Sequence, residues 1–364
     1  MAIENVYVDA SVRHHDATRQ FVRKLGIEPR ILDDTASLFE KIKAHEDPWG
    51  RGKQVLLLTR NKGGFLKNCP GTREYICCGY DILHIGSYCT MDCAYCILQV
   101  YFHPPILQYF VNHEDLMNEL QEVFQQPGIR RMGTGEFTDS LIWETWSDLS
   151  TELVERFASQ DHAVLELKTK TTAIDRFRGL RHNKKTILAW SLNTSQMIAG
   201  LERGTASLKA RMRAAAQCQE WGYPVAFHFD PLVIYPGCED DYREVLKTLF
   251  QTVSADGVVW ISLGTFRFMP ALRSVIETRF PDATLVYGEF IPGLDGKMRY
   301  FKPLRTNLYR SLVECIKTLA PNVTPYLCME DHQVWEQAFG FTPDDRGGLP
   351  AMLDESARHH CHLI

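Results

Sequence analysis

Apolar runs alternate with amphipathic stretches along most of the chain, a pattern typical of parallel strands joined by crossover helices. Six apolar runs of strand length begin at residue 82: Ile82–Ile85, Ile129–Thr134, Ala163–Lys168, Thr186–Leu192, Val225–Ile234 and Val258–Leu263. Apolar residues at helical spacing predict helices between them at Glu114–Gln125, Ser150–Ala158, Leu208–Trp221 and Asp240–Thr252. The chain is therefore predicted to be an α/β protein with a partial (β/α)6 barrel of the TIM type. In such barrels the active site gathers at the C-terminal ends of the strands.

The segments on either side of this repeat follow other patterns. Residues 1–80 are expected to mix strands with amphipathic helices, at Val6–Asp9, Gln54–Thr59, Asp16–Leu25 and Thr35–Ala44. Beyond the sixth strand we expect a strand at Thr284–Tyr287, a helix at Thr306–Thr318 and then a polar tail, whose ending from His359 to Ile364 is expected to be disordered. These patterns divide the chain into an N-terminal α/β extension (1–80), the barrel (81–300) and a C-terminal helix and tail (301–364).

Composition and charge indicate the class of protein and the compartment in which we expect it. Hydrophobic residues make up 45% and charged residues 23% of the 364 residues, as in globular proteins with a substantial core. The apolar runs are far shorter than the roughly 20 residues that cross a membrane, and no secretory signal is visible, so we expect a cytoplasmic protein without membrane contact. Eleven cysteines in a reducing compartment indicate metal or catalytic thiols rather than disulfides. The net charge of −5 gives no general attraction to nucleic acid, although a local basic groove stays compatible with it.

Three cysteines on one short loop carry the most specific chemistry. Cys89, Cys93 and Cys96 lie within the run from Gly86 to Gln99. Three thiolates can hold three irons of a [4Fe-4S] cluster and leave the fourth iron open, whereas such clusters usually take four thiolates. The alternatives are three ordinary cysteines or part of a zinc site, but zinc sites usually show a second Cys/His pair, which does not follow here.

The C-x3-C-x2-C spacing, with an aromatic residue before the last cysteine, resembles the radical S-adenosylmethionine superfamily. The resemblance implies that the open iron binds the amino and carboxylate groups of S-adenosylmethionine. One electron from the cluster would then cleave the cofactor to a 5′-deoxyadenosyl radical, which abstracts hydrogen from a substrate. It also implies a reductant such as flavodoxin or ferredoxin. The protein itself would supply binding and orientation.

Residues at the ends of the predicted strands are candidates for binding this cofactor. Gly133, Thr134 and Gly135 follow the second strand and resemble the superfamily's Gly-Gly-Glu element, whose backbone carbonyls accept hydrogen bonds from the cofactor's amine. The alternative is a plain turn between a strand and a helix. Lys168 ends the third strand, where its ammonium could pair with the cofactor carboxylate or lie at the surface.

Four further polar residues belong to the same candidate set. Ser191 and Asn193 close the fourth strand with groups suited to ribose hydroxyls or to the carboxylate. Glu202 and Arg211 follow, on a turn and a helix, and could reach the cofactor or pair with each other.

Longer motifs resemble one branch of the superfamily, the spore photoproduct lyase family. They lie at Lys62–Thr72, Tyr75–Tyr80, Cys93–Gln99, Ser191–Asn193 and Glu202–Leu208. The resemblance covers about residues 50–320. It implies cleavage of a carbon–carbon bond in the methylene-bridged thymine dimer of damaged DNA, with a cysteine that returns a hydrogen atom and two tyrosines that carry the radical.

The chain departs from that family pattern at two positions. Tyr95 is present, but Ile97 replaces the second tyrosine, and Glu136 stands where the hydrogen-donating cysteine is expected. The O–H bond of a carboxylic acid is too strong to give a hydrogen atom to a carbon radical. Cys238, after the fifth strand, is the replacement donor that the sequence offers.

Three hypotheses follow from this mixture of match and mismatch. The first is an enzyme acting on a pyrimidine dimer or another nucleobase lesion in DNA. The second is the same radical chemistry on a non-DNA substrate, either a small metabolite or a peptide. The third is a non-catalytic iron–sulfur redox sensor. Cys69, Cys77 and Cys78 are interpreted as buried thiols or, less simply, as part of an auxiliary cluster.

Overall fold

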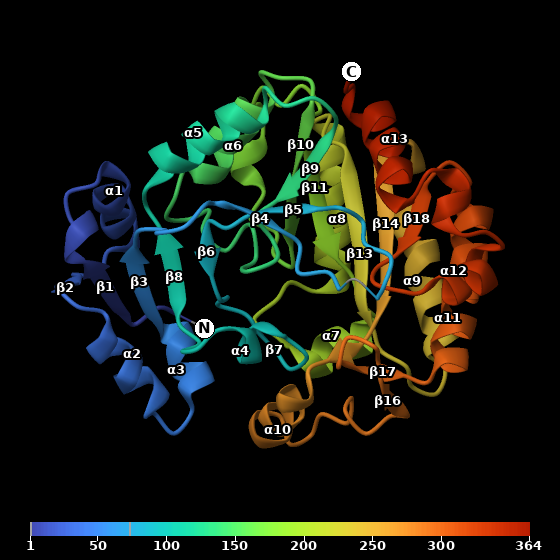
Figure 1. Cartoon of the computed structure of the whole chain (residues 1–364), viewed down its shortest axis with the longest axis horizontal. Helices are drawn as coiled ribbons and strands as arrows, with labels where there is room; N and C mark the ends of the chain where they lie inside the picture. The colour runs from blue at the N-terminus through green and yellow to red at the C-terminus, as the bar shows by residue number, and fades with distance from the viewer. Residues whose placement is uncertain (1, 73) are drawn as a thin grey trace.

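The computed structural model describes residues 2–72 and 74–364, which build two sheets with helices packed around them (Figure 1). The first sheet has the strand order β2-β1-β3-β8-β6. Its strands are β1 (Asn5–Asp9), β2 (Arg30–Leu32), β3 (Val55–Thr59), β8 (Leu107–Phe110) and β6 (Gly86–Ser87). All neighbours pair in parallel except β6, which is antiparallel to β8. The N-terminal sheet is thus completed by strands from residues 86–110.

The second sheet is the curled half-barrel. Its order is β18-β14-β13-β11-β10-β9-β5-β4, and all pairs are parallel except β4 with β5. The strands are β4 (Leu66–Asn68), β5 (Asp81–Leu83), β9 (Arg130–Gly133), β10 (Ala163–Thr169), β11 (Thr186–Ser191), β13 (Val225–Leu232), β14 (Val258–Thr265) and β18 (Thr324–Leu327). This arrangement confirms the α/β fold and the partial barrel, since the six predicted strands are present in their predicted order.

Helices cover the outside of the barrel, and their sequences explain their ends. The barrel helices are α5 (His113–Val123), α6 (Leu149–Phe157), α7 (Ser195–Leu201), α8 (Leu208–Glu220), α9 (Cys238–Thr252), α10 (Pro270–Arg279) and α11 (Lys302–Leu319). The side chains of Thr194 and Ser207 accept hydrogen bonds from backbone N–H groups in the first turns of α7 and α8, as N-cap residues do. The strands β10 and β14 are buried almost throughout, so the core lies between these strands and the helices.

Around the N-terminal sheet lie α1 (Asp16–Leu25), α2 (Ala36–Lys43) and α3 (Pro48–Gln54), while α4 (Leu98–Tyr101) follows the cysteine loop. The amphipathic helix α1 begins with Asp16 and ends at Gly26, whose φ of +73° allows the left-handed C-terminal cap. The predicted strand Val6–Asp9 and helix Asp16–Leu25 are confirmed.

Two expectations for the C-terminal part are wrong. Residues 284–287 form a turn rather than a strand. The apolar side chains of Leu285 and Val286 are buried against the core, but their backbone forms no hydrogen-bonded ladder with another strand. The nearby strands are β15 (Arg267–Phe268), β16 (Phe290–Pro292) and β17 (Met298–Tyr300) in a small antiparallel sheet.

The polar tail is also ordered. Residues 324–361 form β18 followed by α12 (His332–Phe339) and α13 (Leu349–Cys361). Leu349, Leu353, Ala357 and Cys361 recur at helical spacing and are buried, and α13 packs on β14 and β18. The expectation of a disordered tail is therefore wrong, because the buried face of α13 covers β18, the seventh parallel strand of the half-barrel. The divisions at residues 80 and 300 stay a prediction.

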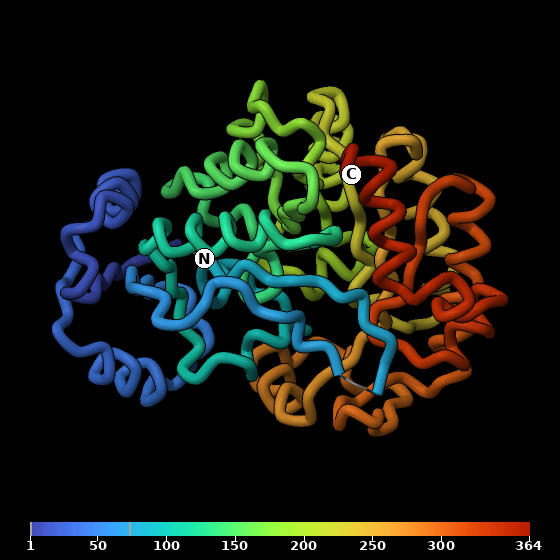
Figure 2. Tube along the Cα trace, turned by 45° about the horizontal axis from the view of Figure 1, so that its top comes forward, coloured from blue at the N-terminus to red at the C-terminus, as the bar shows by residue number. Residues whose placement is uncertain are grey.

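A segment between β4 and β5 joins the two edges of the half-barrel. We call residues 69–72 and 74–80 the bridging segment. It leaves β4 at one edge and reaches the other edge, where the Ile76 N–H donates to the Glu330 carbonyl just beyond β18 (3.0 Å). Figure 2 shows this light-blue chain crossing to the red C-terminal part.

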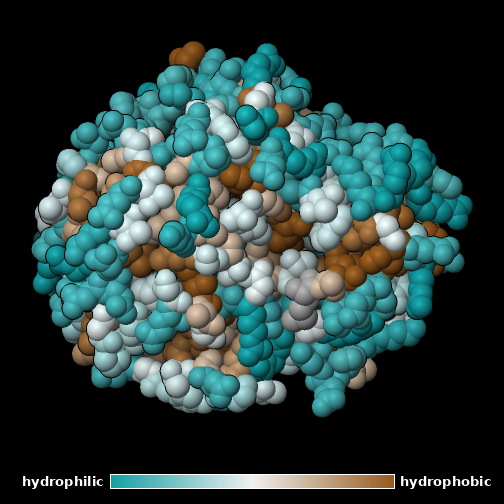
Figure 3. Space-filling view, turned by 180° about the vertical axis from the view of Figure 1, so that it is seen from behind, coloured by the Kyte–Doolittle hydropathy of each residue, from teal (hydrophilic) through white to brown (hydrophobic). Residues whose placement is uncertain are grey.

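The outer surface is mixed. Seen from behind, it is mostly hydrophilic, with apolar side chains showing across its middle (Figure 3). Among the described residues, no helix has both the length and the apolar character that crossing a membrane would take.

Candidate active site

The three cysteines lie on a loop that starts at β6, passes through the short strand β7 (Asp92–Cys93) and ends at α4. Cys89 and Cys93 are buried and Cys96 is half-buried. Just before them, Tyr88 has a φ of +72°, which is a strained conformation for a bulky residue. Its N–H donates to the Phe137 carbonyl (2.9 Å) and its hydroxyl donates to the Trp49 carbonyl (3.1 Å). The surrounding structure therefore holds the loop in an otherwise unfavourable shape.

A buried lysine from the end of α3 supports the first half of the loop. The Lys53 ammonium donates to the carbonyls of Cys89 (3.0 Å) and Met91 (2.5 Å) and lies 4.2 Å from the centre of the Tyr88 ring. Its side chain is 1% exposed and sits 3.8 Å from Asp92. A buried ammonium needs such partners because burial without them is costly.

Gln99 and Arg279 support the second half. The Gln99 amide donates to the carbonyls of Cys93 (3.4 Å), Ala94 (3.1 Å) and Cys96 (3.3 Å). Arg279, at the end of α10, makes a two-pronged ion pair with Asp92 (2.9 and 3.2 Å). Sequence reasoning missed Lys53, Gln99 and Arg279, and only Gln99 was near enough to the motif to have drawn attention.

The donor set fits an iron–sulfur cluster. Burial raises the pKa of Cys89 to about 12, and it raises the pKa of Cys93 well above its ordinary value. The thiols are therefore protonated until iron displaces their protons, which couples metal binding to pH. Within residues 2–72 and 74–364, no three His, Cys, Asp or Glu side chains are arranged to hold one metal ion. In a cubane cluster, each thiolate binds a different iron.

Tyr95, Glu202 and Arg211 form one buried chain beside the loop. The Tyr95 hydroxyl donates to the Glu202 carboxylate, which pairs with Arg211 (Nη2–Oε2 2.5 Å). The short strand β12 (Glu202–Arg203) pairs with β7, so Glu202 lies opposite Cys93. Arg211 is fully buried and also donates to the Ser191 carbonyl (2.9 Å). Of the two alternatives for Glu202 and Arg211, the structure thus shows them paired with each other.

Asn193 already has protein partners. Its amide donates to the Pro231 carbonyl (2.9 Å), and its oxygen accepts from the Tyr242 hydroxyl (2.7 Å). Ser191 is buried at the end of β11. Both residues lie at the C-terminal ends of the strands as expected, and Asn193 also fastens β13 to α9.

The Gly133–Gly135 turn packs closely at the end of β9. A Cβ at Gly133 would lie 1.7 Å from the Tyr80 hydroxyl, and one at Gly135 would lie 2.9 Å from the Lys168 Cβ. The Thr134 hydroxyl donates to the Ser140 hydroxyl (2.8 Å). Packing alone therefore requires these glycines, whatever ligand the turn also meets.

Glu136 and Lys168 form an ion pair at the mouth of the barrel, with side chains 31% and 18% exposed. Burial opposes the charge of Lys168, but the carboxylates of Glu136 and Glu166 outweigh it and raise its pKa. The cation predicted to pair with a cofactor carboxylate is thus paired with the residue that replaces the expected thiol.

Aromatic rings connect this turn to the cysteine loop. Tyr101, at the end of α4, stacks on Phe137 with ring centres 5.6 Å apart, and His84 contacts the same ring at 4.7 Å. Ile97 is 37% exposed at the start of this helix. The cysteine loop and the turn that carries Glu136 are therefore neighbours.

Cys238 begins α9, and its N–H donates to the Tyr235 carbonyl (3.0 Å).

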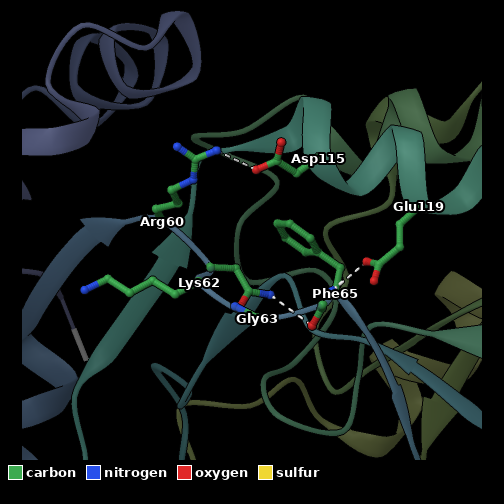
Figure 4. A pocket seen from close by; sticks show the side chains of 8 residues that line it. Arg60, Lys62, Gly63, Phe65, Asp115 and Glu119 are labelled. Carbon is green, nitrogen blue, oxygen red and sulfur yellow. Dashed lines mark hydrogen bonds and ion pairs between the residues drawn. The ribbon is translucent and has the colours of Figure 1, made fainter.

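One open pocket lies away from these residues. It has a volume of about 520 Å³ and lies between α5 and the loop after β3, with Arg60, Lys62, Phe65 and Glu119 in its lining (Figure 4). Arg60 pairs with Asp115 (2.8 Å), and the Phe65 N–H donates to Glu119 (2.6 Å). Arg60 and Glu119 therefore already have partners in the protein, and no predicted site residue lines the pocket.

Comparisons with known proteins agree with the sequence resemblance. The family model for spore photoproduct lyase matches residues 77–297. The spore photoproduct lyase of Bacillus subtilis (strain 168) is 27% identical over 294 residues, which are 77% of this chain and 83% of that protein. A solved spore photoproduct lyase mutant with dinucleoside spore photoproduct has a TM-score of 0.79 at 21% identity and covers 89% of this chain and 98% of its own.

A further mutant, with bound AdoMet and dinucleoside spore photoproduct, has a TM-score of 0.77 at 20% identity, over 89% of this chain and 98% of its own. At these identities the solved structures support the shared fold alone. The family match, by contrast, spans more than half of the sequence and includes the three cysteines. This chain therefore belongs to the spore photoproduct lyase family and is a radical S-adenosylmethionine enzyme related to spore photoproduct lyase.

Proposed function

We propose that Cys89, Cys93 and Cys96 ligate a [4Fe-4S] cluster whose open iron binds S-adenosylmethionine. When bound and reduced, this pair supplies a 5′-deoxyadenosyl radical that abstracts hydrogen from a substrate. One observation carries the proposal: Lys53 and Arg279, from distant parts of the chain, and Gln99, at the end of the loop, hold the cysteine loop in a strained shape. A one-electron donor such as flavodoxin or ferredoxin, in a reducing compartment such as the cytoplasm, completes it.

The remaining site residues receive roles in this proposal. Gly133, Thr134, Gly135 and Lys168 border the cofactor at the ends of β9 and β10, with Ser191 and Asn193 at the next strand ends. Glu202 and Arg211 act through Tyr95 and the loop rather than on the cofactor, since they are buried against each other. Tyr95 carries the radical onward, and the hydrogen donor is a thiol, for which the sequence offers Cys238 as one candidate.

We infer that the substrate is a nucleobase lesion in DNA, such as a pyrimidine dimer whose carbon–carbon bond is broken. Family membership supports this substrate class. The Glu136–Lys168 ion pair favours the second candidate, a non-DNA substrate, because it places charges at the barrel mouth where the family pattern expects a thiol.

The test is cofactor cleavage by the anaerobically reconstituted protein with S-adenosylmethionine and dithionite. The wild type and a Cys315→Ala control, altered inside α11, should form 5′-deoxyadenosine. Cys89→Ala should lose at least about 99% of it. Equal yields from the wild type and Cys89→Ala would leave only the redox-sensor hypothesis.

The substrate is tested in the same assay with oligonucleotides that carry a thymine dimer. A DNA substrate should raise the 5′-deoxyadenosine yield and be consumed with it. An unchanged yield and an intact dimer would exclude the DNA lesion and favour the non-DNA candidate.

A further inference from the structure

Four cysteines outside the cysteine loop lie near one another at the mouth of the barrel. Cys69, Cys77 and Cys78 lie on the bridging segment, and Cys328 directly follows β18. The contact between Ile76 and Glu330 holds that segment against the chain beyond β18. Thiols that are more than 240 residues apart in the sequence, counted from Cys78 to Cys328, thereby become neighbours.

Cys328 has the better-defined position. Its N–H donates to the Leu263 carbonyl of β14 (2.9 Å), so it sits where two parallel strands end. Its sulfur accepts a hydrogen bond from Arg267 (3.3 Å), and Arg267 is itself held by Asp230 at the end of β13 (3.0 Å). The C-terminal ends of barrel strands are where reacting groups gather.

The Glu136–Lys168 ion pair faces the same space. Both of its charges act on the thiol of Cys328 and on that of Cys69. The charged groups near Cys328 therefore include Arg267 and Asp230 as well as this ion pair. As a whole residue, Cys328 is half-buried at the ends of β14 and β18.

The protonation states separate the four thiols. Burial raises the pKa of Cys69 and of Cys328 to about 12, and a hydrogen bond with Cys77, together with burial, raises the pKa of Cys78 well above its ordinary value. These three thiols therefore carry an S–H bond at neutral pH. The Cys77 pKa is lowered, chiefly by a hydrogen bond from Cys78, which favours the thiolate. Only a group that keeps its S–H can give up a hydrogen atom, and an S–H bond is much weaker than the O–H bond of Glu136.

We propose that Cys328, held by Arg267 at the barrel mouth, is a catalytic residue that donates the hydrogen atom which ends the radical reaction. This rests on the proposed function and extends it. The S–H bond of Cys328 breaks and a C–H bond forms on the product radical, which leaves a thiyl radical. One electron from the flavodoxin- or ferredoxin-type reductant and one proton from water restore the thiol.

The test uses deuterated water, the dinucleoside spore photoproduct and the reconstituted full chain. A thiol exchanges its hydrogen with solvent, so the wild type should place one deuterium in the repaired product. Cys328→Ser keeps an acceptor for Arg267 but offers only a strong O–H bond. It should form 5′-deoxyadenosine within about twofold of the wild type and lose at least tenfold in deuterated product. Cys69→Ala and Cys315→Ala should keep the wild-type yield.

A second measurement needs no turnover. In the wild type without S-adenosylmethionine, the dinucleoside should slow alkylation of Cys328 at least threefold and leave Cys315 unchanged, as followed by mass spectrometry. Because this alkylation measurement uses the wild type, it tests the inference even if Cys328→Ser fails to fold.

The outcomes separate the two proposals. Absence of 5′-deoxyadenosine in the wild type defeats the proposed function. Normal 5′-deoxyadenosine with full deuterated product from Cys328→Ser defeats this inference alone, as does loss of that product in Cys69→Ala or Cys238→Ala instead. Unprotected Cys328, or a wild type that cleaves the cofactor and leaves the dinucleoside intact, also overturns it.

Discussion

The cysteine loop and the barrel mouth are neighbours, yet their polar groups are paired in different ways. In the loop, the buried side chains of Lys53 and Gln99 and the Arg279 guanidinium satisfy backbone carbonyls and Asp92. At the mouth, Glu136 and Lys168 pair while partly exposed, and the buried Tyr80 hydroxyl is among the described groups without a hydrogen-bond partner. The loop is thus built for one fixed geometry, whereas the mouth has charges and donors that a bound molecule can engage.

The strongest test of this contrast is Lys53→Met. The substitution leaves the carbonyls of Cys89 and Met91 without their buried donor, so the free energy of unfolding should fall by roughly 4 kcal/mol. The iron content after reconstitution should fall as well. Anaerobic urea unfolding and iron analysis would measure both effects.

The matched control is Lys43→Met, which removes an exposed ion pair with Glu40 on α2. Its change should stay below about 0.5 kcal/mol. If Lys53→Met unfolded no more easily than this control, the loop would not depend on its buried donor.

The second largest expected effect is a dependence of stability on pH that comes from His84, at the boundary of the cysteine loop and the barrel mouth. His84 touches Phe137 and lies 3.0 Å from the Ser87 hydroxyl. Burial, with a smaller effect from Lys67, lowers its pKa from 6.5 to about 4. Between these values the unfolded chain binds the proton more readily than the native one, so stability falls as pH falls from 6.5 to 4.

His84→Gln should remove this share of the pH dependence, which amounts to about 2 kcal/mol between pH 7 and pH 5. Urea unfolding of the variant and the wild type at both pH values would measure it. Parallel pH profiles for the two proteins would contradict the burial of a neutral imidazole.

The smallest of these expected effects on stability comes from a substitution at the barrel mouth. Glu136→Gln breaks a partly exposed ion pair, so the free energy of unfolding should change by less than about 1 kcal/mol. Thermal unfolding would show it. A loss as large as that of Lys53→Met would mean that the mouth is as rigidly determined as the loop, and the contrast between them would fail.

The sequence predicts the elements whose signal is local. The six parallel strands are apolar runs bounded by turns, and Asp16–Leu25 has both a periodic apolar face and a terminal glycine. The strand β18 is only four residues long and contains Pro325, which removes a backbone donor. The run at 284–287 looked like a strand because apolar residues buried in a turn have the same composition as a strand.

The site divides in the same way. Cys89, Cys93 and Cys96 share one loop, so their spacing already carries the chemistry. The pairing of Glu202 with Arg211 was one of two alternatives that only the folded chain decides. The approach of Cys328 to Glu136 depends on the curvature of a whole sheet, and Lys53 is brought to the loop by the packing of α3 on β3 and β8 of the first sheet. Such contacts leave no periodic or spacing signal.

The three side chains that hold the cysteine loop also bear on how the protein is made. Lys53 is synthesised before the cysteines, Gln99 just after them, and Arg279 about half the chain later. A nascent chain that has just exposed Cys96 therefore contains every proposed sulfur ligand but lacks the guanidinium that fixes Asp92. The loop reaches its final shape only after the ribosome has passed residue 279, so iron delivery is best matched to a nearly complete polypeptide.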